Sequence, residues 1–318
     1  VGLLTTLQRP KWAELRSKLM SSAGNAASVK SMDEALFLIA LDFDHTCQNL
    51  TASMYHLILG NYSNRWFDKS HQLVVTGDGT AGINRDHSFL DGHPTSRYVQ
   101  YLNAQLELAS GAGKALPLEP ITWTVDSVIA KAILDAEQYV ASVSLHFNID
   151  TWESPELSAS RAKALGLNAD FVMQAAIHMA CYKVFGHLIN STEAVHMRHT
   201  VSGRYDSILT LTPAMSQLVR KFDRADTAER RRLMSLGQEA HRERIRACKK
   251  GKSPILHLMA LLASKREAGS LKLKADGIYW RDRIKLIAAP WQDITSCVVT
   301  TSHPGARPGL ECSGFTDT

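Results

Sequence analysis

Long hydrophobic segments are scarce in this sequence of 318 residues, which excludes a chain built from membrane-spanning helices. The longest apolar run is Ala35–Leu41, far below the roughly 20 residues that a spanning helix needs. Glycine and proline are also few, at 19 and 10 residues, whereas 45% of the chain is hydrophobic. These values exclude collagen-like and low-complexity chains and indicate a globular protein with room for two domains.

Cysteines are equally sparse: there are five, an odd number, scattered without any pair at C-x-x-C spacing. This pattern argues against a disulfide framework and offers no zinc-ligand spacing, so we expect no metal site. A reducing, intracellular compartment fits best. No methionine or signal-like segment opens the chain, and we therefore expect a fragment of a longer protein.

Charge is concentrated in one segment. Residues 221–252 hold eleven Lys and Arg against five acids, a net charge of +6, whereas the whole chain carries +5. The rest of the chain is therefore close to neutral, which argues against a protein that coats nucleic acid. The basic segment is either a solvated helix surface or a face that meets a phosphate-rich ligand or a partner.

Hydrophobic periodicity predicts a largely helical chain. Helices are expected near Pro10, over residues 96–108, 124–148 and 227–248, and from a cap at Asp170 to about residue 187. The first has Trp12, Leu15 and Leu19 on one apolar face, and the last has apolar rows on two faces, which indicates a buried helix. Residues 72–84, with glycines in the middle, predict a β-hairpin, whereas Ala35–Leu41 fits a buried strand or a helix face equally well. The glycines and prolines of residues 111–120 suggest a linker, which divides the chain into domains 1–122 and 123–318.

One motif points to phosphate chemistry. Asp42–Thr46 has the D-x-D-x-T pattern of haloacid-dehalogenase-type phosphatases, in which the first Asp is the nucleophile and both carboxylates hold magnesium. Gly77–Gly79 would be the later acidic motif, but it follows after only about 35 residues, too few for the intervening elements. We favour the simpler interpretation, in which two acids end a buried segment.

The setting of His87 is more informative. It follows the second strand of the predicted hairpin and has acids on both sides, Asp86 and Asp91, with Gly92 next to the second. An imidazole that a carboxylate can orient is what a general base requires. The segment therefore predicts a catalytic histidine.

Several segments in order resemble the choline/carnitine acyltransferase family. The resemblance starts from an N-R-W-F-D-K segment, the apolar strand after it and an H-S-x-x-D-G segment, and it extends over most of the chain. The matching segments are Val1–Trp12, Asn64–Lys69, Gln72–Val75, His87–Gly92, Lys163–Asp170, Glu193–Ile208, Ala240–Leu261 and Thr300–Ser302.

The resemblance implies a two-domain α/β fold with mixed sheets flanked by helices and an active-site tunnel between the domains. It implies acyl transfer between coenzyme A (CoA) and the hydroxyl group of a small alcohol, without a permanently bound cofactor. His87 would be the general base, Asp91 would orient its ring, and Ser302 would donate a hydrogen bond to the oxyanion. On this basis residues 1–122 are the histidine-bearing part, and residues 123–318 are a second domain that is truncated at its C-terminus.

The same resemblance implies which residues bind CoA. Lys163 matches one of the family's CoA lysines, and Asp170 matches an acid near the CoA chain. Two further lysine positions hold Ala159 and Gly166 here, and Arg161 is the expected substitute because guanidinium groups bind phosphate well.

The acceptor alcohol is less well defined. Tyr205, Thr192, Ser207 and Thr300 are the expected acceptor-binding residues. Leu256 stands where carnitine enzymes have the arginine that pairs with the carnitine carboxylate. Carnitine is the family's commonest acceptor, but choline or another alcohol is an open alternative, and so is an inactive descendant. By analogy with the family we expect a mitochondrial or peroxisomal location. We also expect a monomer that does not bind nucleic acid, and we leave membrane association open.

Overall fold

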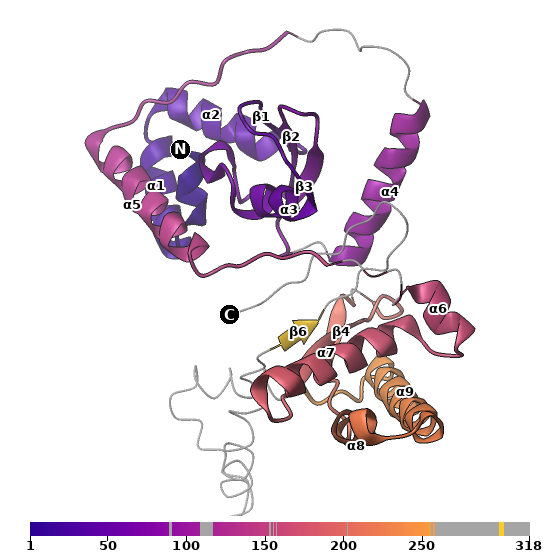
Figure 1. The fold of residues 1–318 in the computed structure, drawn as a ribbon. Coiled ribbons are helices and arrows are strands. Elements are labelled where there is room, and N and C mark those ends of the chain that lie inside the picture. The colour runs from indigo at the N-terminus through magenta and orange to yellow at the C-terminus, as the bar shows by residue number, and fades with distance from the viewer. Residues whose placement is uncertain are drawn as a thin grey trace, which may run out of the picture. The chain divides into compact units, whose positions relative to one another are not determined.

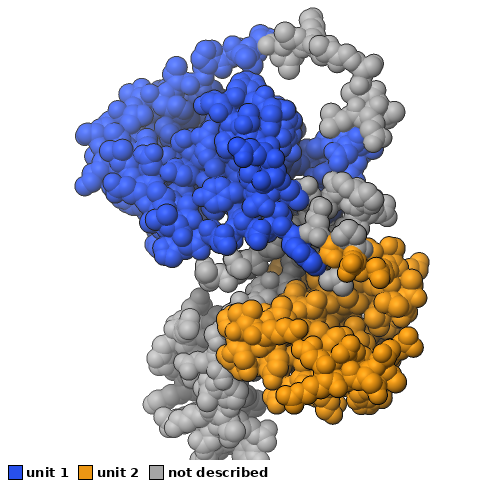
Figure 2. Space-filling model, in the orientation of Figure 1, with its two compact units in different colours: residues 1–153 blue, residues 154–318 orange. Residues whose placement is uncertain are grey.

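The computed structural model describes residues 1–88, 91–108, 117–152, 154, 156, 158–201, 203–255, 257 and 299–301. The chain forms two compact units, residues 1–153 and 154–318 (Figure 2). The domain boundary near residue 122 stays a prediction, although the helix that follows it packs within the first unit. None of the described helices is both long enough and apolar enough to cross a membrane.

The first unit is built around a mixed three-stranded sheet in the order β1-β2-β3 (Figure 1). β1 (Leu38–Asp42) pairs in parallel with β2 (His71–Thr76), and β2 pairs in antiparallel fashion with β3 (Ala81–Arg85). The apolar run therefore forms a strand from Leu38 onward, but the strand is not buried as expected: Ile39 is 57% exposed and Leu41 50%. The predicted hairpin is confirmed, and its turn contains Gly79 at a φ of +81°, a conformation that suits glycine.

The first unit also contains helices before, between and after its strands. The helical elements of the first unit are η1 (Gly2–Thr6), α1 (Arg9–Met20), α2 (Ala23–Glu34), α3 (Leu50–Leu59), η2 (Tyr62–Asn64), α4 (Gly92–Leu108) and α5 (Ser127–Ser144). The predicted apolar face of α1 is confirmed, because Trp12, Leu15 and Leu19 are buried. They pack with Leu4, Trp66 and Ile129 of α5 in one hydrophobic cluster. The core thus ties α5 to the N-terminal segment.

The second unit has the same kind of layered arrangement. Its elements are α6 (Ala159–Ala164), α7 (Ala169–Phe185), β4 (Ser191–His196), β5 (Tyr205–Leu209), α8 (Pro213–Lys221), η4 (Phe222–Arg224), α9 (Thr227–Lys249) and β6 (Val299–Thr301). The sheet has the order β5-β4-β6, with an antiparallel and a parallel pair. Phe171, Met215, Leu218 and Leu233 pack α7, α8 and α9 together. The expected α/β architecture with mixed sheets and flanking helices is confirmed in both units.

Helix α7 differs from the prediction in two ways. Its cap is Asn168, whose side chain accepts a hydrogen bond from the backbone N–H of Phe171, whereas Asp170 lies in the first turn. Asn and Asp are equally good caps, so residue type alone did not locate the helix start. Only one face of α7 is buried, and Val184 on the second apolar face is 76% exposed.

Candidate functional site

His87 lies in a turn between β3 and α4, directly after the hairpin. Its Nδ1 is 3.8 Å from Oδ1 of Asp91, and the imidazole side chain is 44% exposed. Asp86 accepts a hydrogen bond from the backbone N–H of Ser88 at 3.0 Å, which shapes the turn. Gly92 is the first residue of α4, so the chain enters a helix at this point. His87 and Asp91 are therefore neighbours, at a separation longer than a hydrogen bond, and the orienting role of Asp91 stays a prediction.

The hairpin that carries His87 is held by a well-bonded turn. Oδ1 of Asp78 accepts from the hydroxyl of Thr76 at 2.6 Å, and its Oδ2 accepts from the backbone N–H of Cys47 at 2.9 Å. These hydrogen bonds hold the pKa of Asp78 well below its usual value. Asn84 on β3 donates to the carbonyl of Leu57 and thereby joins the hairpin to α3. The support for His87 thus comes from β2, β3 and α3 together.

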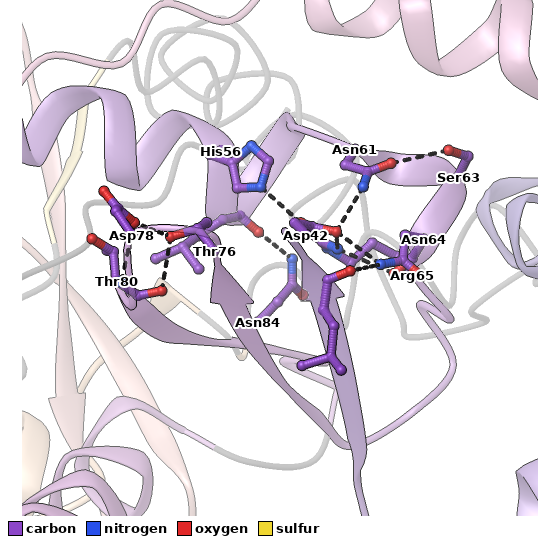
Figure 3. Close-up of polar contacts among 12 residues, drawn as sticks. Asp42, His56, Asn61, Ser63, Asn64, Arg65, Thr76, Asp78, Thr80 and Asn84 are labelled. Atoms are coloured by element: carbon purple, nitrogen blue, oxygen red, sulfur yellow. Dashed lines mark hydrogen bonds and ion pairs between the residues drawn. The ribbon is translucent and has the colours of Figure 1, made fainter. Parts of the chain in front are cut away.

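Asp42, at the end of β1, is the centre of a buried polar network (Figure 3). Asn61 and Asn64 donate to its Oδ1 at 2.6 and 2.8 Å. Arg65 and His56 contact its Oδ2, each at 2.7 Å. Burial by itself would raise the pKa of Asp42, but the hydrogen bonds from Arg65, Asn64 and His56 outweigh it and hold this pKa well below normal.

This network contradicts the phosphatase hypothesis. Asp42 is only 2% exposed, and both of its carboxylate oxygens are already bonded to side chains of the same unit. A nucleophile needs an oxygen that faces its substrate. Asp78 likewise closes the hairpin turn. Asp42 is therefore a buried structural acid at the end of β1, but the segment before it is not buried as expected, because Ile39 and Leu41 are half-exposed.

In the second unit, four predicted acceptor-binding residues occupy one face of the sheet. The β4–β5 register pairs Ala194 with Ser207 and His196 with Tyr205. The β4–β6 register places Thr300 beside Thr192. Because directly paired residues share a face, Thr192, Ser207, Tyr205 and Thr300 belong to the same side of the sheet. The strand register thus places these residues on one face, with Tyr205 four positions along β4 from Thr192, and their role in acceptor binding stays a prediction.

The predicted CoA residues lie at the junction of α6 and α7. Arg161 and Lys163 are exposed in the last turn of α6, and Asp170 is in the first turn of α7. Gly166 between them has a φ of +73°, a left-handed conformation that favours glycine over lysine. The absence of a lysine at this position therefore has a local structural reason.

A pocket of about 330 Å³ opens between this junction and α9. Phe171 and Ile245 give it an apolar wall, and Gln238 joins it to the α6–α7 loop by accepting from the backbone N–H of Asn168 at 2.6 Å. Its cationic lining residues are Arg242, Arg246 and Lys249, which belong to the basic segment 221–252 but were not separated from its other charges by the sequence analysis. Their spacing of three to four residues along a helix is the signal that could have identified them.

A second buried cluster lies next to the pocket. Nε2 of His241, a pocket-lining residue, is 3.3 Å from Oδ2 of Asp170 and 3.4 Å from Oε2 of Glu193. Burial, and then the charge and hydrogen bond of Asp170, raise the pKa of Glu193 to about 8. The three residues come from α9, α7 and β4, so only the tertiary fold brings them together.

A sequence model of the choline/carnitine O-acyltransferase family matches residues 1–317. The chain belongs to this family. The suspected resemblance is therefore confirmed over the whole chain.

Curated acyltransferases are similar to this chain. Carnitine O-palmitoyltransferase 2 of Macaca fascicularis is 26% identical over 275 residues, which cover 82% of this chain and 41% of the relative. The same enzyme of Rattus norvegicus is 27% identical over 295 residues, 88% of this chain and 44% of the relative. The mitochondrial carnitine O-acetyltransferase of Saccharomyces cerevisiae is 25% identical over 252 residues, 76% and 38% respectively. The chain thus spans about two fifths of the length of these relatives.

Two residues that the resemblance singled out lie outside the part of the chain that the structure describes. Ser302, the expected oxyanion donor, and Leu256, at the position of the carnitine-binding arginine, lie outside the described residues. Thr300 is described only by its strand position. The roles of Ser302, Leu256 and Thr300 in the family reaction stay predictions.

Proposed function

We propose that this chain carries out the family's CoA-dependent O-acyl transfer, moving an acyl group between CoA and the hydroxyl group of a small alcohol. The observation that carries the proposal is the ion-pair contact of His87 with Asp91 directly after the β2–β3 hairpin. Family membership supports the reaction type. The two units would be the halves of the family's tunnel-forming fold.

His87 acts as the general base through a specific atom. Its Nδ1 faces Asp91, so Nε2 is the nitrogen that takes the proton from the acceptor hydroxyl. The deprotonated hydroxyl attacks the thioester carbonyl, the C–S bond breaks, and the proton passes from the imidazolium to the CoA thiolate. Asp91 favours the tautomer with the proton on Nδ1 and stabilises the imidazolium as it forms. Ser302 would stabilise the oxyanion of the tetrahedral intermediate.

The α6–α7 junction and the adjoining pocket would bind CoA. The exposed Lys163 and Arg161, with the cationic side chains of α9, provide positive charge for its phosphates. The apolar wall formed by Phe171 and Ile245 suits an uncharged part of the ligand. The basic segment seen in the sequence would therefore have a ligand-binding side, which agrees with the phosphate-rich alternative.

The polar face of the second sheet would bind the acceptor. Thr192, Ser207 and Tyr205 supply hydroxyl groups there, and Thr300 holds the adjacent register position. Carnitine is the acceptor named in the relatives. With Leu256 at the arginine position, choline or another alcohol without a carboxylate avoids the cost of an unpaired carboxylate. By analogy with the relatives named as mitochondrial, we propose a mitochondrial location.

Replacing His87 with alanine tests the reaction. His87→Ala should lower acyl transfer at least about a hundredfold, because a general base contributes roughly 10²–10⁴ in rate. The measurement is release of free CoA from acetyl- and palmitoyl-CoA, with carnitine and choline as acceptors. His146→Ala is the matched control, since His146 is exposed just after α5 and its ring contacts the local carbonyl of Ser142. A His87→Ala protein that keeps a tenth of wild-type activity would show that this mechanism is wrong.

A further inference from the structure

Glu193 is a buried acid with few hydrogen-bond donors. It is 7% exposed, and its Oε2 accepts no hydrogen bond from the described residues. The ion-pair contact of this atom is with Nε2 of His241 at 3.4 Å, and that nitrogen also contacts Asp170 at 3.3 Å. Two carboxyl groups therefore share one imidazole. This is too little positive charge to keep both of them ionised at low cost.

Protonation of one of the two carboxyl groups removes the need for a second positive charge. Burial, reinforced by the neighbouring Asp170, raises the pKa of Glu193 to about 8, so the acid is protonated at neutral pH. In this form its O–H donates to the Asp170 carboxylate, and the second negative charge disappears. Asp170 is the more exposed of the two, with 28% of its side chain accessible against 9% for Glu193. The proton is therefore expected on Glu193 and the negative charge on Asp170.

The other groups around Glu193 do not change this assignment. Burial lowers the pKa of His178 to about 4, so this residue is neutral. The guanidinium of Arg244 donates to the carbonyl of Leu209 at 2.6 Å. This hydrogen bond is to a neutral group and does not compensate the charge of a carboxylate. Burial first, and then the charges of Asp206 and Glu193, raise the pKa of Cys248 to about 11, so the thiol is uncharged. The groups that interact with Glu193 are Asp170 of α7 and His241 and Cys248 of α9. The neighbours of these groups include His178 of α7, which interacts with His241, and Asp206 of β5, which interacts with Cys248.

The cluster lies at the back of the cationic pocket. His241 contacts both carboxyl groups and also lines the pocket with Arg242, Arg246 and Lys249. Ionisation of Glu193 would place a second negative charge one side chain away from the site of an anionic ligand. It would also remove the hydrogen bond that holds the Asp170 carboxyl group in the first turn of α7.

We propose that Glu193, in its protonated form, is a positioning residue for CoA, holding Asp170 in place and keeping the back of the pocket from carrying two negative charges. This inference rests on the proposed CoA site between α6, α7 and α9. Beyond the proposed site, this inference predicts that CoA binds more weakly when Glu193 loses its proton. The expected loss in affinity is about three- to tenfold, the size of a charge–charge repulsion across a partly solvated distance.

Calorimetric titration of the full chain with CoA between pH 6.5 and 9 tests this inference. Wild-type protein should lose about three- to tenfold in affinity as the pH rises through about 8. Glu193→Gln should bind CoA with an affinity that is flat over this range, because its amide N–H replaces the acid O–H and cannot ionise. Glu193→Ala should bind weakly at every pH. Glu229→Gln is the matched control and should follow the wild type, because Glu229 is at the far end of α9 and pairs with Arg232.

Infrared difference spectroscopy separates the possible failures. A protonated carboxyl C=O band that is present in wild type at pH 7 and missing in Glu193→Gln would confirm the proton without reference to CoA. If wild-type protein binds no CoA at any pH, the proposed CoA site is wrong, and this inference fails with it. If wild type binds CoA but Glu193→Gln shows the same decline with pH, or if the band is absent, the CoA site stands and the role of Glu193 is wrong.

Discussion

The Asp42 network of the first unit and the Asp170–Glu193–His241 cluster of the second are both buried, and both pair a carboxylate with a histidine. Asp42 accepts from two asparagines and is paired with the guanidinium of Arg65 at 2.7 Å. The second cluster has two acids, and among the described residues their ion-pair contacts are those to His241, at 3.3 and 3.4 Å. The two regions therefore differ in the ratio of negative charges to donors.

This ratio determines whether the carboxyl groups of each region stay ionised or take up a proton. A carboxylate saturated by donors stays ionised and fixes the geometry around it, as Asp42 does for β1, α3 and the segment before β2. A carboxyl pair with too few donors takes up a proton, and its charge then depends on pH. The second region borders the pocket that His241 lines together with Arg242 and Arg246. The charge of the Asp170–Glu193–His241 cluster can therefore affect a ligand in this pocket. The Asp42 network instead joins elements of the first unit to one another.

The largest effect on stability is expected when Asp42 loses the positive charge that pairs with it. Arg65→Met removes a buried partner whose side chain is 1% exposed and leaves Asp42 without its cation. We expect the free energy of unfolding to fall by about 3–5 kcal/mol, as when one member of a buried ion pair is removed. Urea denaturation of the chain measures it. A loss below about 1 kcal/mol would mean that the remaining donors suffice and that the pair is not the basis of the network.

The pH dependence of stability sharpens the comparison, because the two regions should respond with opposite signs. The pKa of Glu193 is raised from its ordinary 4.5 to about 8, so the unfolded chain loses this proton at a lower pH than the folded chain does. Its contribution to stability therefore falls between about pH 5 and pH 8, by at most about 1.4 kcal/mol per pH unit. The pKa of Asp42 is lowered, so its contribution is present above its ordinary pKa and is lost on acidification.

Urea denaturation of Glu193→Gln and wild type at pH 5, 6.5 and 8 checks this difference. The variant should become progressively more stable than the wild type as the pH rises, because glutamine has no proton to lose. Glu229→Gln should not, since its carboxylate is exposed and its own pKa is lowered by Arg232. A constant difference between Glu193→Gln and wild type across the three pH values would show that Glu193 is already ionised at pH 5.

Local features of the fold were predictable because they are encoded over short distances. The hairpin from β2 to β3 follows from alternation around a glycine turn, and the buried face of α1 follows from helical spacing. The His87–Asp91 pair is visible because four residues separate its members. The apolar run Ala35–Leu41 could not be assigned, because only its parallel pairing with β2 makes it a strand.

Long-range features were not predictable from residue patterns alone. Glu193, Asp170 and His241 belong to three elements, and no spacing connects them. Asp42 looked like a nucleophile because the sequence shows its acidic neighbour Asp44 but not the donors that His56 and Arg65 bring to it. The shared face of Thr192, Ser207 and Tyr205 was expected only from the family resemblance, and the strand register supplies its physical basis.

Asn61 offers the smallest and most selective test of the balanced network. It donates to Asp42 at 2.6 Å and has a left-handed backbone, with a φ of 40°. Asn61→Gly should cost about 1–2 kcal/mol of unfolding free energy, because one donor is lost while Asn64, Arg65 and His56 remain. Asn61→Ala should cost about 1 kcal/mol more, since an alanine side chain disfavours the left-handed conformation that glycine adopts freely. Equal losses for the two variants, measured by urea denaturation, would mean that the backbone at this position carries no strain. A loss as large as that of Arg65→Met would mean that the donors to Asp42 are not redundant, and the contrast with the donor-poor cluster around Glu193 would then fail.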